Sequence, residues 1–166
     1  MTDFEIRDAR RDDLPDLIRL VQALAAYEKD PASAVATTDQ FDHALFPTTG
    51  SPAASCLVVE HADRPGHVVA MALWFATFST WTGQQGMWLE DLFVEPEQRG
   101  SGIGRALLGR LAQICVERGY PRFEWTVLDW NTPSIDFYRS RGARPQSEWT
   151  TFRLDGEALD RLAGEA

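Results

Sequence analysis

The sequence predicts a mixed α/β fold built around one sheet, and three observations lead to that class. Runs of β-branched and aromatic residues alternate with amphipathic helix patterns along the chain. Two such runs, 55–61 and 67–78, are joined by the short segment ADRPG, which indicates an antiparallel hairpin. The run 87–94 precedes a helix pattern and then another strand-like run, which indicates a β-α-β unit. A length of 166 residues fits a single domain over 1–166.

The first part of the chain predicts one strand and two helices. Residues 4–9 alternate apolar and polar side chains, as a half-buried strand does. Apolar residues then recur at helical spacing over 12–28, and Asp12 is the expected N-cap of that helix. A short helix is expected over 39–46 and a Ser/Thr/Pro/Gly-rich loop over 47–55.

The part that follows the hairpin predicts alternating strands and helices up to the C-terminus. After the strand 87–94, a glycine-rich turn opens a helix over 104–119, with Gly119 as its C-cap, and a strand over 122–128. A turn and a helix over 129–143, starting at Pro133 and stopping at Gly142, come next. We expect a final strand at 147–154 and a terminal helical tail at 155–163.

Charge and composition exclude several classes of protein. The net charge of −9, from 16 basic and 25 acidic side chains, argues against a nucleic-acid surface. No apolar run approaches the ~20 residues that span a bilayer, and MTDFEIRDAR has no apolar signal region. We therefore expect a cytoplasmic protein with neither nucleic acid nor membrane as a partner. The two cysteines and three histidines show no zinc spacing, so no metal is expected, and Cys115 is expected to be a buried, inert thiol.

The segment EQRGSGIGRALL carries the strongest signal for a ligand. Gly100, Gly102 and Gly104 alternate between Arg99 and Arg105, after a strand and before a helix. Such a turn leaves backbone N–H groups and the positive end of the helix dipole facing outward, which suits a phosphate or diphosphate. The spacing fits neither a P-loop nor a dinucleotide fingerprint. A glycine-rich helix start without a ligand is the alternative.

At these residues the chain resembles the GNAT superfamily of N-acetyltransferases, which bind acetyl-CoA. QRGSGIGRALL matches the family's Q/R-x-x-G-x-G/A signature, and WNTPSIDFYRSRGA matches its Asn/Tyr segment. With AAYEKD, WTG, WLEDLFV and FRLDGEALDRLA, the motifs follow the order seen in the diamine and polyamine (spermidine/spermine-type) members. The loop 47–55 and the turn HADRPGH, where substrate selection would lie, differ from that branch. The resemblance implies a splayed, mostly antiparallel central sheet flanked by helices, and a homodimer.

The resemblance also implies which residues hold acetyl-CoA. Backbone groups of one strand are expected to pair with the pantetheine arm as an added strand would, and these belong to Leu92, Phe93 and Val94. The expected contacts of the diphosphate and of the later helix start are Arg99, Gly100, Ser101, Gly102, Ile103, Gly104, Arg105, Asn131, Thr132, Pro133, Ser134 and Tyr138. Asn131 also fits a helix cap, and both roles can coexist.

Acetyl transfer to an amine requires a proton acceptor. An alkylamine has a pKa of about 10.4, so reaching its neutral form at pH 7 costs about 4.6 kcal/mol. Glu90 is the candidate acceptor, directly or through water. Strand alternation places Glu90 and neighbouring Asp91 on opposite faces, and the β-bulge that the family carries here would re-aim one of them. Asp91 is then a candidate substrate contact. The alternative is that one carboxylate faces solvent.

The remaining candidates serve the leaving group and the substrate. Tyr138, at the family's tyrosine position, is expected to protonate the departing thiolate. Tyr27 and Glu28 end the first helix, where the family contacts substrate; Glu28 could equally be a surface charge. Trp81 is expected to wall the amine channel by a cation–π contact, or to anchor a loop.

The sequence therefore predicts an acetyl-CoA-dependent N-acetyltransferase that acts directly, without an acyl-enzyme, on a small cationic primary amine: a diamine, a polyamine or a lysine-like amine. Two alternatives stay open, a peptide or protein N-acetyltransferase and a non-catalytic CoA-binding domain. The presence of both Glu90 and Tyr138 argues against the second, because a pure binder needs neither.

Overall fold

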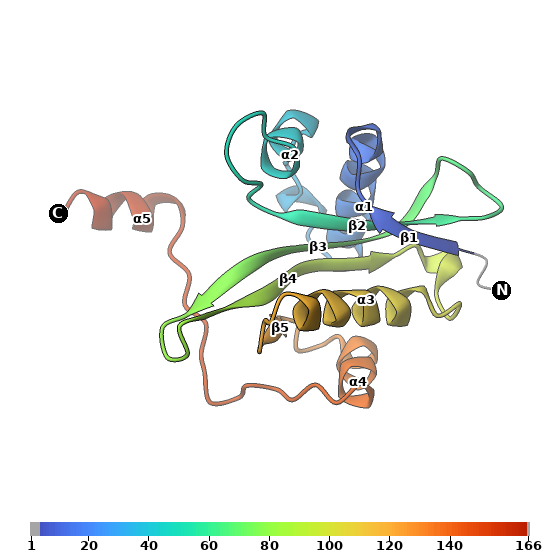
Figure 1. Ribbon diagram of the computed structural model, residues 1–166. Helices are drawn as coiled ribbons and strands as arrows, with labels where there is room; N and C mark the ends of the chain where they lie inside the picture. Colours follow the sequence, from blue (N-terminus) through green and yellow to red (C-terminus); the bar gives the residue numbers. More distant parts are fainter. Residues whose placement is uncertain (1–3, 166) are drawn as a thin grey trace. The chain divides into compact units, whose positions relative to one another are not determined.

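The computed structural model describes residues 4–165, and the chain divides into two compact units. The first unit runs to Thr126 and the second begins at Val127. Figure 1 colours the chain from its N-terminus to its C-terminus. Within residues 4–165, no helix has both the length and the apolar character needed to cross a bilayer.

The first unit is a five-stranded sheet in which the strands lie side by side in chain order. Its strands are β1 (Phe4–Asp8), β2 (Ser55–His61), β3 (Val68–Ser79), β4 (Gln84–Val94) and β5 (Phe123–Trp125). The first three pairs are antiparallel, and only β4 and β5 are parallel, since α3 crosses between them. The mixed, mostly antiparallel sheet is therefore confirmed, although β5 is shorter than the strand expected at 122–128.

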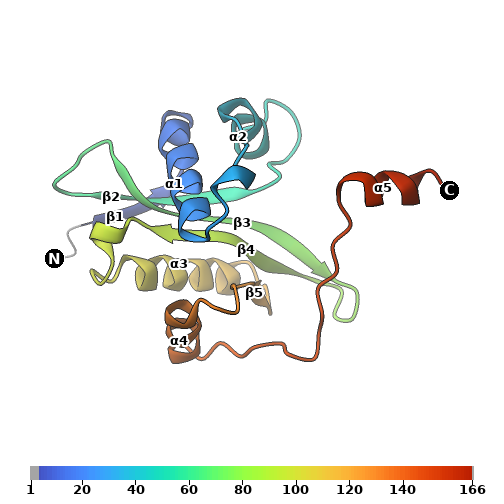
Figure 2. The same cartoon turned by 180° about the vertical axis from the view of Figure 1, so that it is seen from behind.

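Helices cover both faces of this sheet. Helices α1 (Leu14–Tyr27) and α2 (Thr38–Leu45) lie over one face and α3 (Ile103–Glu117) over the other, as Figures 1 and 2 show. Three short 3-10 turns complete the unit: η1 (Arg11–Asp13), η2 (Pro31–Ser33) and η3 (Pro96–Gln98). Leu17 and Leu20 of α1 pack with Val58, Met71 and Phe93 of the sheet in one buried cluster. The expected helices and the strands of the hairpin are thus present.

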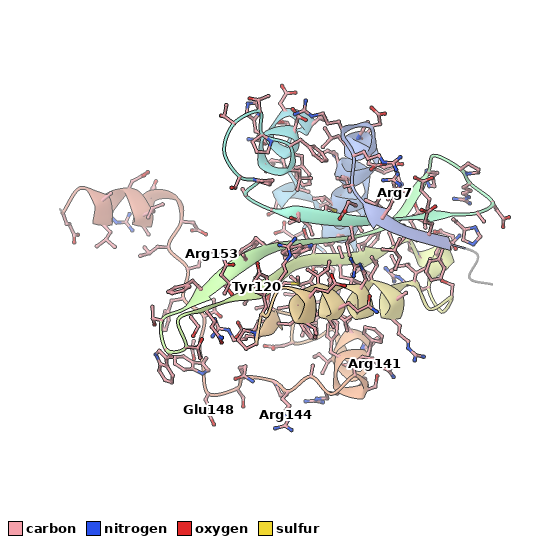
Figure 3. The ribbon with its side chains drawn as sticks, viewed as in Figure 1. Arg7, Tyr120, Arg141, Arg144, Glu148 and Arg153 are labelled. Atoms are coloured by element: carbon pink, nitrogen blue, oxygen red, sulfur yellow. The ribbon has the colours of Figure 1, made fainter. Side chains whose placement is uncertain are left out.

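The N-cap expected at Asp12 is wrong, because α1 begins one residue later. Its N-cap is Asp13, whose side chain makes no capping hydrogen bond. The Asp13 carboxylate instead accepts hydrogen bonds from the backbone N–H of Arg10 at 2.6 Å and from the Arg7 guanidinium at 2.7 Å. Arg7 lies on β1 (Figure 3), so this carboxylate ties the start of the helix to the sheet.

The second unit contains α4 (Thr132–Ser140) and α5 (Gly156–Ala163), joined by an extended segment. Pro133 lies in the first turn of α4 and Gly142 adopts a positive φ after its end, as expected. The final strand expected at 147–154 is wrong: this segment forms no strand, and Trp149 and Phe152 are 72% and 91% exposed. A strand needs a neighbour for its backbone hydrogen bonds, and the segment has no such partner among the described residues.

Candidate active site

A β-bulge in β4 determines where the two central carboxylates point. Leu73 of β3 pairs with Asp91 and Trp74 with Leu89, so Glu90 is an extra residue without a partner in the register. Before the bulge, Met87 faces α3, since its Sδ lies 3.7 Å from Sγ of Cys115. After the bulge, the odd-numbered positions face α1 instead.

The change of face is visible in the packing around β4. Phe93 belongs to the core cluster under α1, and Asp91 shares its face by strand alternation. Leu92 and Val94 face α3, where their methyl groups lie 3.9 and 3.8 Å from the position of a Cβ at Gly104. The bulge expected from the family resemblance is therefore present. It leaves the side chains of Glu90 and Asp91 on the α1 side of the sheet.

The charges of two carboxylates, Glu90 and Glu28, act on a third, that of Asp91. Burial, followed by the charges of Glu90 and Glu28, raises the pKa of Asp91 from 3.8 to about 6. Burial also raises the pKa of Glu28, which immediately follows α1. The structure thus brings together the end of α1 and the bulge of β4 as an acidic cluster, made of Glu28, Glu90 and Asp91, that attracts cations.

The indole of Trp88 adds a polar contact to this cluster. Trp88 is half-buried, and its Nε1–H donates a hydrogen bond of 2.9 Å to Oε2 of Glu90. The sequence-based list of site residues did not include Trp88. The i, i+2 spacing on one strand face is the signal that could have revealed it.

The glycine turn leads from β4 into α3. Gly100 and Gly102 adopt φ values of +84° and +92°, which a residue with a Cβ rarely tolerates, and a Cβ at either position would meet no atom within 4 Å. Gly102 is the N-cap of α3 and offers no capping side chain. The N–H groups of the first turn of α3 therefore have no side-chain cap, and the space beside the turn is open.

The edge of β4 next to this turn is open as well. Parallel pairing with β5 covers only Met87–Leu89. From Glu90 to Val94, β4 has no strand on that side among the described residues. The backbone edge of Leu92–Val94 is therefore not covered by β5, and it leads toward the turn that opens α3.

Arg99 packs across the start of the turn. Its Cζ lies 4.8 Å from the ring centre of Tyr27 and 5.6 Å from that of Phe93, and its Nε donates to the Val94 carbonyl at 3.2 Å. This cation–π stack joins the end of α1 to the turn that opens α3. Tyr27 therefore meets Arg99, a pairing that the sequence did not indicate.

The second unit carries the other family-motif residues. The Asn131 side chain accepts a hydrogen bond from the N–H of Ser134 at 3.4 Å, which makes it the N-cap of α4, as expected. Tyr138 is a half-buried residue of α4, and burial raises the pKa of its phenol. A phenol with a raised pKa keeps its proton at neutral pH and can donate it.

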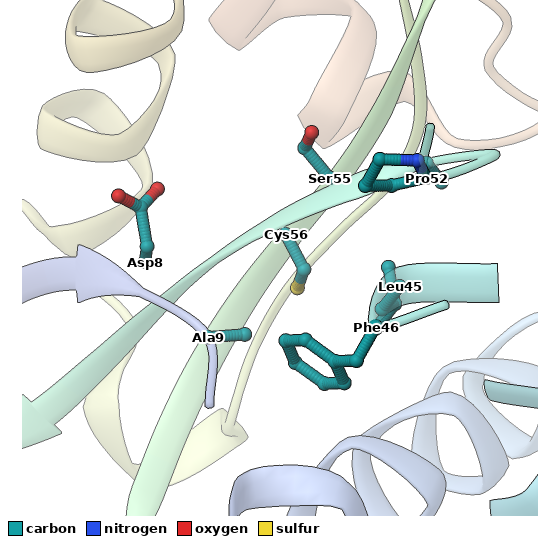
Figure 4. A pocket seen from close by; sticks show the side chains of 8 residues that line it. Asp8, Ala9, Leu45, Phe46, Pro52, Ser55 and Cys56 are labelled. Atoms are coloured by element: carbon teal, nitrogen blue, oxygen red, sulfur yellow. The ribbon is translucent and has the colours of Figure 1, made fainter. Parts of the chain in front are cut away.

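Two further features are the side chain of Trp81 and a pocket beside the start of β2. Trp81 is 89% exposed in the turn between β3 and β4, at the tip of the hairpin. A shallow pocket, drawn in Figure 4, is lined by Asp8, Ala9, Leu45, Phe46, Pro52, Ala54, Ser55 and Cys56 and contains none of the predicted site residues. Burial raises the pKa of the Cys56 thiol to about 12, and Cys115 is buried as expected, so both are free, inert thiols.

The model of the acetyltransferase (GNAT) family matches residues 18–143. The chain belongs to this family. A thialysine N-epsilon-acetyltransferase from Sus scrofa is 35% identical to this GNAT protein in an alignment that covers 99% of this chain and 100% of the relative. A spermidine/spermine N(1)-acetyltransferase-like protein 1 from Homo sapiens is 34% identical over 98% of this chain and 24% of the relative. The predicted family is therefore confirmed, and this GNAT protein is an N-acetyltransferase.

Solved structures show the same fold. An integron cassette protein from the mobile metagenome of V. cholerae superposes with a TM-score of 0.80 at 24% identity, covering 98% of this GNAT chain and 99% of the other. GNAT enzymes generally use acetyl-CoA as the acetyl donor, which agrees with an open β4 edge beside a glycine turn.

Proposed function

We propose that this enzyme transfers the acetyl group of acetyl-CoA to a primary amine of a small cationic substrate, such as a diamine, a polyamine or a lysine-like amine. The observation that carries the proposal is the acidic cluster of Glu28, Glu90 and Asp91 beside the open edge of β4. Relatives whose names specify thialysine or spermidine/spermine support this substrate class.

The residues of the first unit fit the cofactor. The amides from Gly100 to Arg105 would hold the diphosphate, because two positive-φ glycines and an uncapped helix start leave N–H groups available. The edge of Leu92–Val94 would hold the pantetheine arm by β-augmentation. When bound, acetyl-CoA supplies the activated acetyl thioester. The corresponding roles of Arg99 and of residues 131–134 follow from the family motif.

Glu90 and Tyr138 divide the proton transfers in this proposal. Glu90 accepts a proton from the amine nitrogen at a carboxylate oxygen as the nitrogen attacks the thioester, which offsets part of the cost of about 4.6 kcal/mol for reaching the neutral amine at pH 7. Tyr138 donates its phenolic proton to the leaving sulfur. Glu28 and Asp91 hold a second positive charge of the substrate, with Tyr27 and Trp81 as further contacts.

Calorimetry with acetyl-CoA and a thiol-release assay over an amine panel test this proposal. The panel contains spermidine, short diamines, thialysine, lysine, an aminoglycoside and a peptide with a free N-terminus. We expect measurable acetyl-CoA binding and the highest kcat/KM on a small dication. No uptake of acetyl-CoA by folded protein would refute the proposal, and a preference for the peptide would favour the peptide N-acetyltransferase alternative.

Two matched pairs of variants test the proton transfers. We expect Glu90→Gln and Tyr138→Phe each to lower kcat roughly 10²-fold. Glu5→Gln on β1 and Tyr120→Phe before β5 are the controls, and we expect them to keep full activity. Wild-type rates for Glu90→Gln or Tyr138→Phe would remove that residue from the mechanism.

We also propose that the two units act as one acetyltransferase domain and that the enzyme is a cytoplasmic homodimer. The family match spans the boundary between the units, which supports the first point. Trp149 and Phe152, between α4 and α5, are largely exposed in the single chain. Burial of these apolar side chains against a second copy would remove them from water, which favours a dimer. Two free thiols suit a reducing compartment. Light scattering tests the dimer.

A further inference from the structure

We propose that Trp88 is a positioning residue, which holds the Glu90 carboxylate so that its Oε1 takes the proton of the amine. The inference rests on the role proposed for Glu90. It assigns a function to a side chain that the family motifs leave unexplained.

The backbone of Trp88 is held by neighbouring strands, whereas that of Glu90 is not. Trp88 pairs with Phe75 of β3 and with Glu124 of β5, so its strand is held from both sides. Glu90, as the bulged residue, has no register partner on either strand. The hydrogen bond of 2.9 Å from the indole Nε1–H to Oε2 therefore links an anchored side chain to one at an irregular position.

Electrostatic repulsion makes this link necessary. Asp91 lies close enough to Glu90 for the charge of Glu90 to act on it. Like charges favour rotamers that carry the Glu90 carboxylate away from Asp91 and into solvent. A hydrogen bond to a charged acceptor opposes that movement.

An indole suits this task better than a cationic donor does. Its N–H donates and has no acceptor, so it can neither take the proton that Glu90 receives nor exchange roles with it. It also carries no charge, so the cluster stays negative toward an ammonium substrate. Because Oε2 is occupied by the indole, Oε1 keeps its lone pairs for the substrate proton.

The matched variants Trp88→Phe and Trp88→Tyr test the inference, because they differ only in a hydroxyl donor. We expect Trp88→Phe to lower kcat on the best amine by ~3- to 10-fold, with the KM for acetyl-CoA unchanged. Trp88→Tyr should recover part of this loss, since its O–H can replace the indole N–H. Equal rates for wild type and both variants, all with wild-type melting temperatures, would overturn the inference.

Nuclear magnetic resonance of the indole gives a readout independent of turnover. The Trp88 Nε1–H signal is assigned by its loss in Trp88→Phe. We expect its chemical shift at neutral pH to differ between the wild type and Glu90→Gln, because the variant replaces a charged acceptor by a neutral amide. An identical chemical shift in Glu90→Gln would show that the indole does not hold this carboxylate. Full activity of Glu90→Gln would instead remove Glu90 from the proposed mechanism, and the inference with it, while it leaves the proposed acetyl transfer to a small amine standing.

Discussion

Replacing Asp91 by Asn should stabilise the fold at neutral pH while it weakens the enzyme. Asp91 is half-buried beside Glu90 and Glu28, and its carboxylate has to ionise there at neutral pH. Asn keeps the shape of the side chain and removes the charge, so the folded state no longer bears the cost of that ionisation. The substrate cation loses one of its proposed partners, which should raise the KM for the amine.

The size and sign of the stability change follow from the raised pKa. Burial, followed by the charges of Glu90 and Glu28, raises the pKa of Asp91 from 3.8 to about 6 in the folded chain. The folded chain therefore binds this proton more tightly than the unfolded chain, and ionisation weakens folding. The penalty is absent below pH 3.8, grows as the pH rises toward 6 and is constant above it. It amounts to about 3 kcal/mol at most.

Thermal unfolding of wild type and Asp91→Asn at several pH values measures this effect. At pH 7.5 we expect the variant to melt roughly 5–10 °C higher, since 1 kcal/mol corresponds to about 2–4 °C in a protein of this size. At pH 4 the difference should nearly vanish, because folded wild type is then protonated at Asp91. Asp12→Asn, which removes an exposed carboxylate, is the control and should not raise the melting temperature at pH 7.5. An equal effect of Asp91→Asn at both pH values would refute the reasoning.

Three other predictions concern the turn, an ion pair and the C-terminus. Gly102→Ala should lower the free energy of unfolding by about 1–2 kcal/mol and weaken acetyl-CoA binding, because Gly102 has a left-handed φ. Gly109→Ala, in the middle of α3, should raise the free energy of unfolding by about 0.5–1 kcal/mol. Chemical unfolding and calorimetry with acetyl-CoA compare the two variants. Arg7→Met should destabilise by about 3 kcal/mol in chemical denaturation without changing the KM for the amine, since it strands the buried Asp13 carboxylate. In the wild type, burial opposes ionisation of Asp13, but hydrogen bonds from Arg7 and Arg10 lower the pKa of its carboxyl below the ordinary value of 3.8. The ionised carboxylate therefore stabilises the fold above pH 3.8, and this stabilisation is lost as the pH falls through the lowered pKa of the folded state. Truncation of the chain after Pro145 should convert the proposed dimer to a monomer, and light scattering measures the change in molecular mass. If the truncated protein is still a dimer, the interface lies elsewhere.

Local patterns were enough to predict most elements of this fold. The run Ser55–His61 was predicted as a strand with these bounds, because β-branched residues stand between turn-forming residues. Asn131 was predicted as a cap because its side chain needs to reach only three residues along the chain. Failures arose where a contact between different elements, rather than the local pattern, decided the outcome. The carboxylate of Asp13 pairs with Arg7 of β1 rather than capping α1, and 147–154 has strand-forming residues without a neighbouring strand.

The sequence by itself determined the family motifs, the order of helices and strands and the glycine turn, because these depend on residues close together in the chain. Only the tertiary structure decided that Glu90 is the bulged residue, that Glu28 acts on Asp91, and that Arg99 stacks on Tyr27. Each of these depends on which strand pairs in which register and on where α1 ends above the sheet. A shift of one residue in β4 reverses the face of every side chain beyond it, so the charge cluster exists only once the register is set.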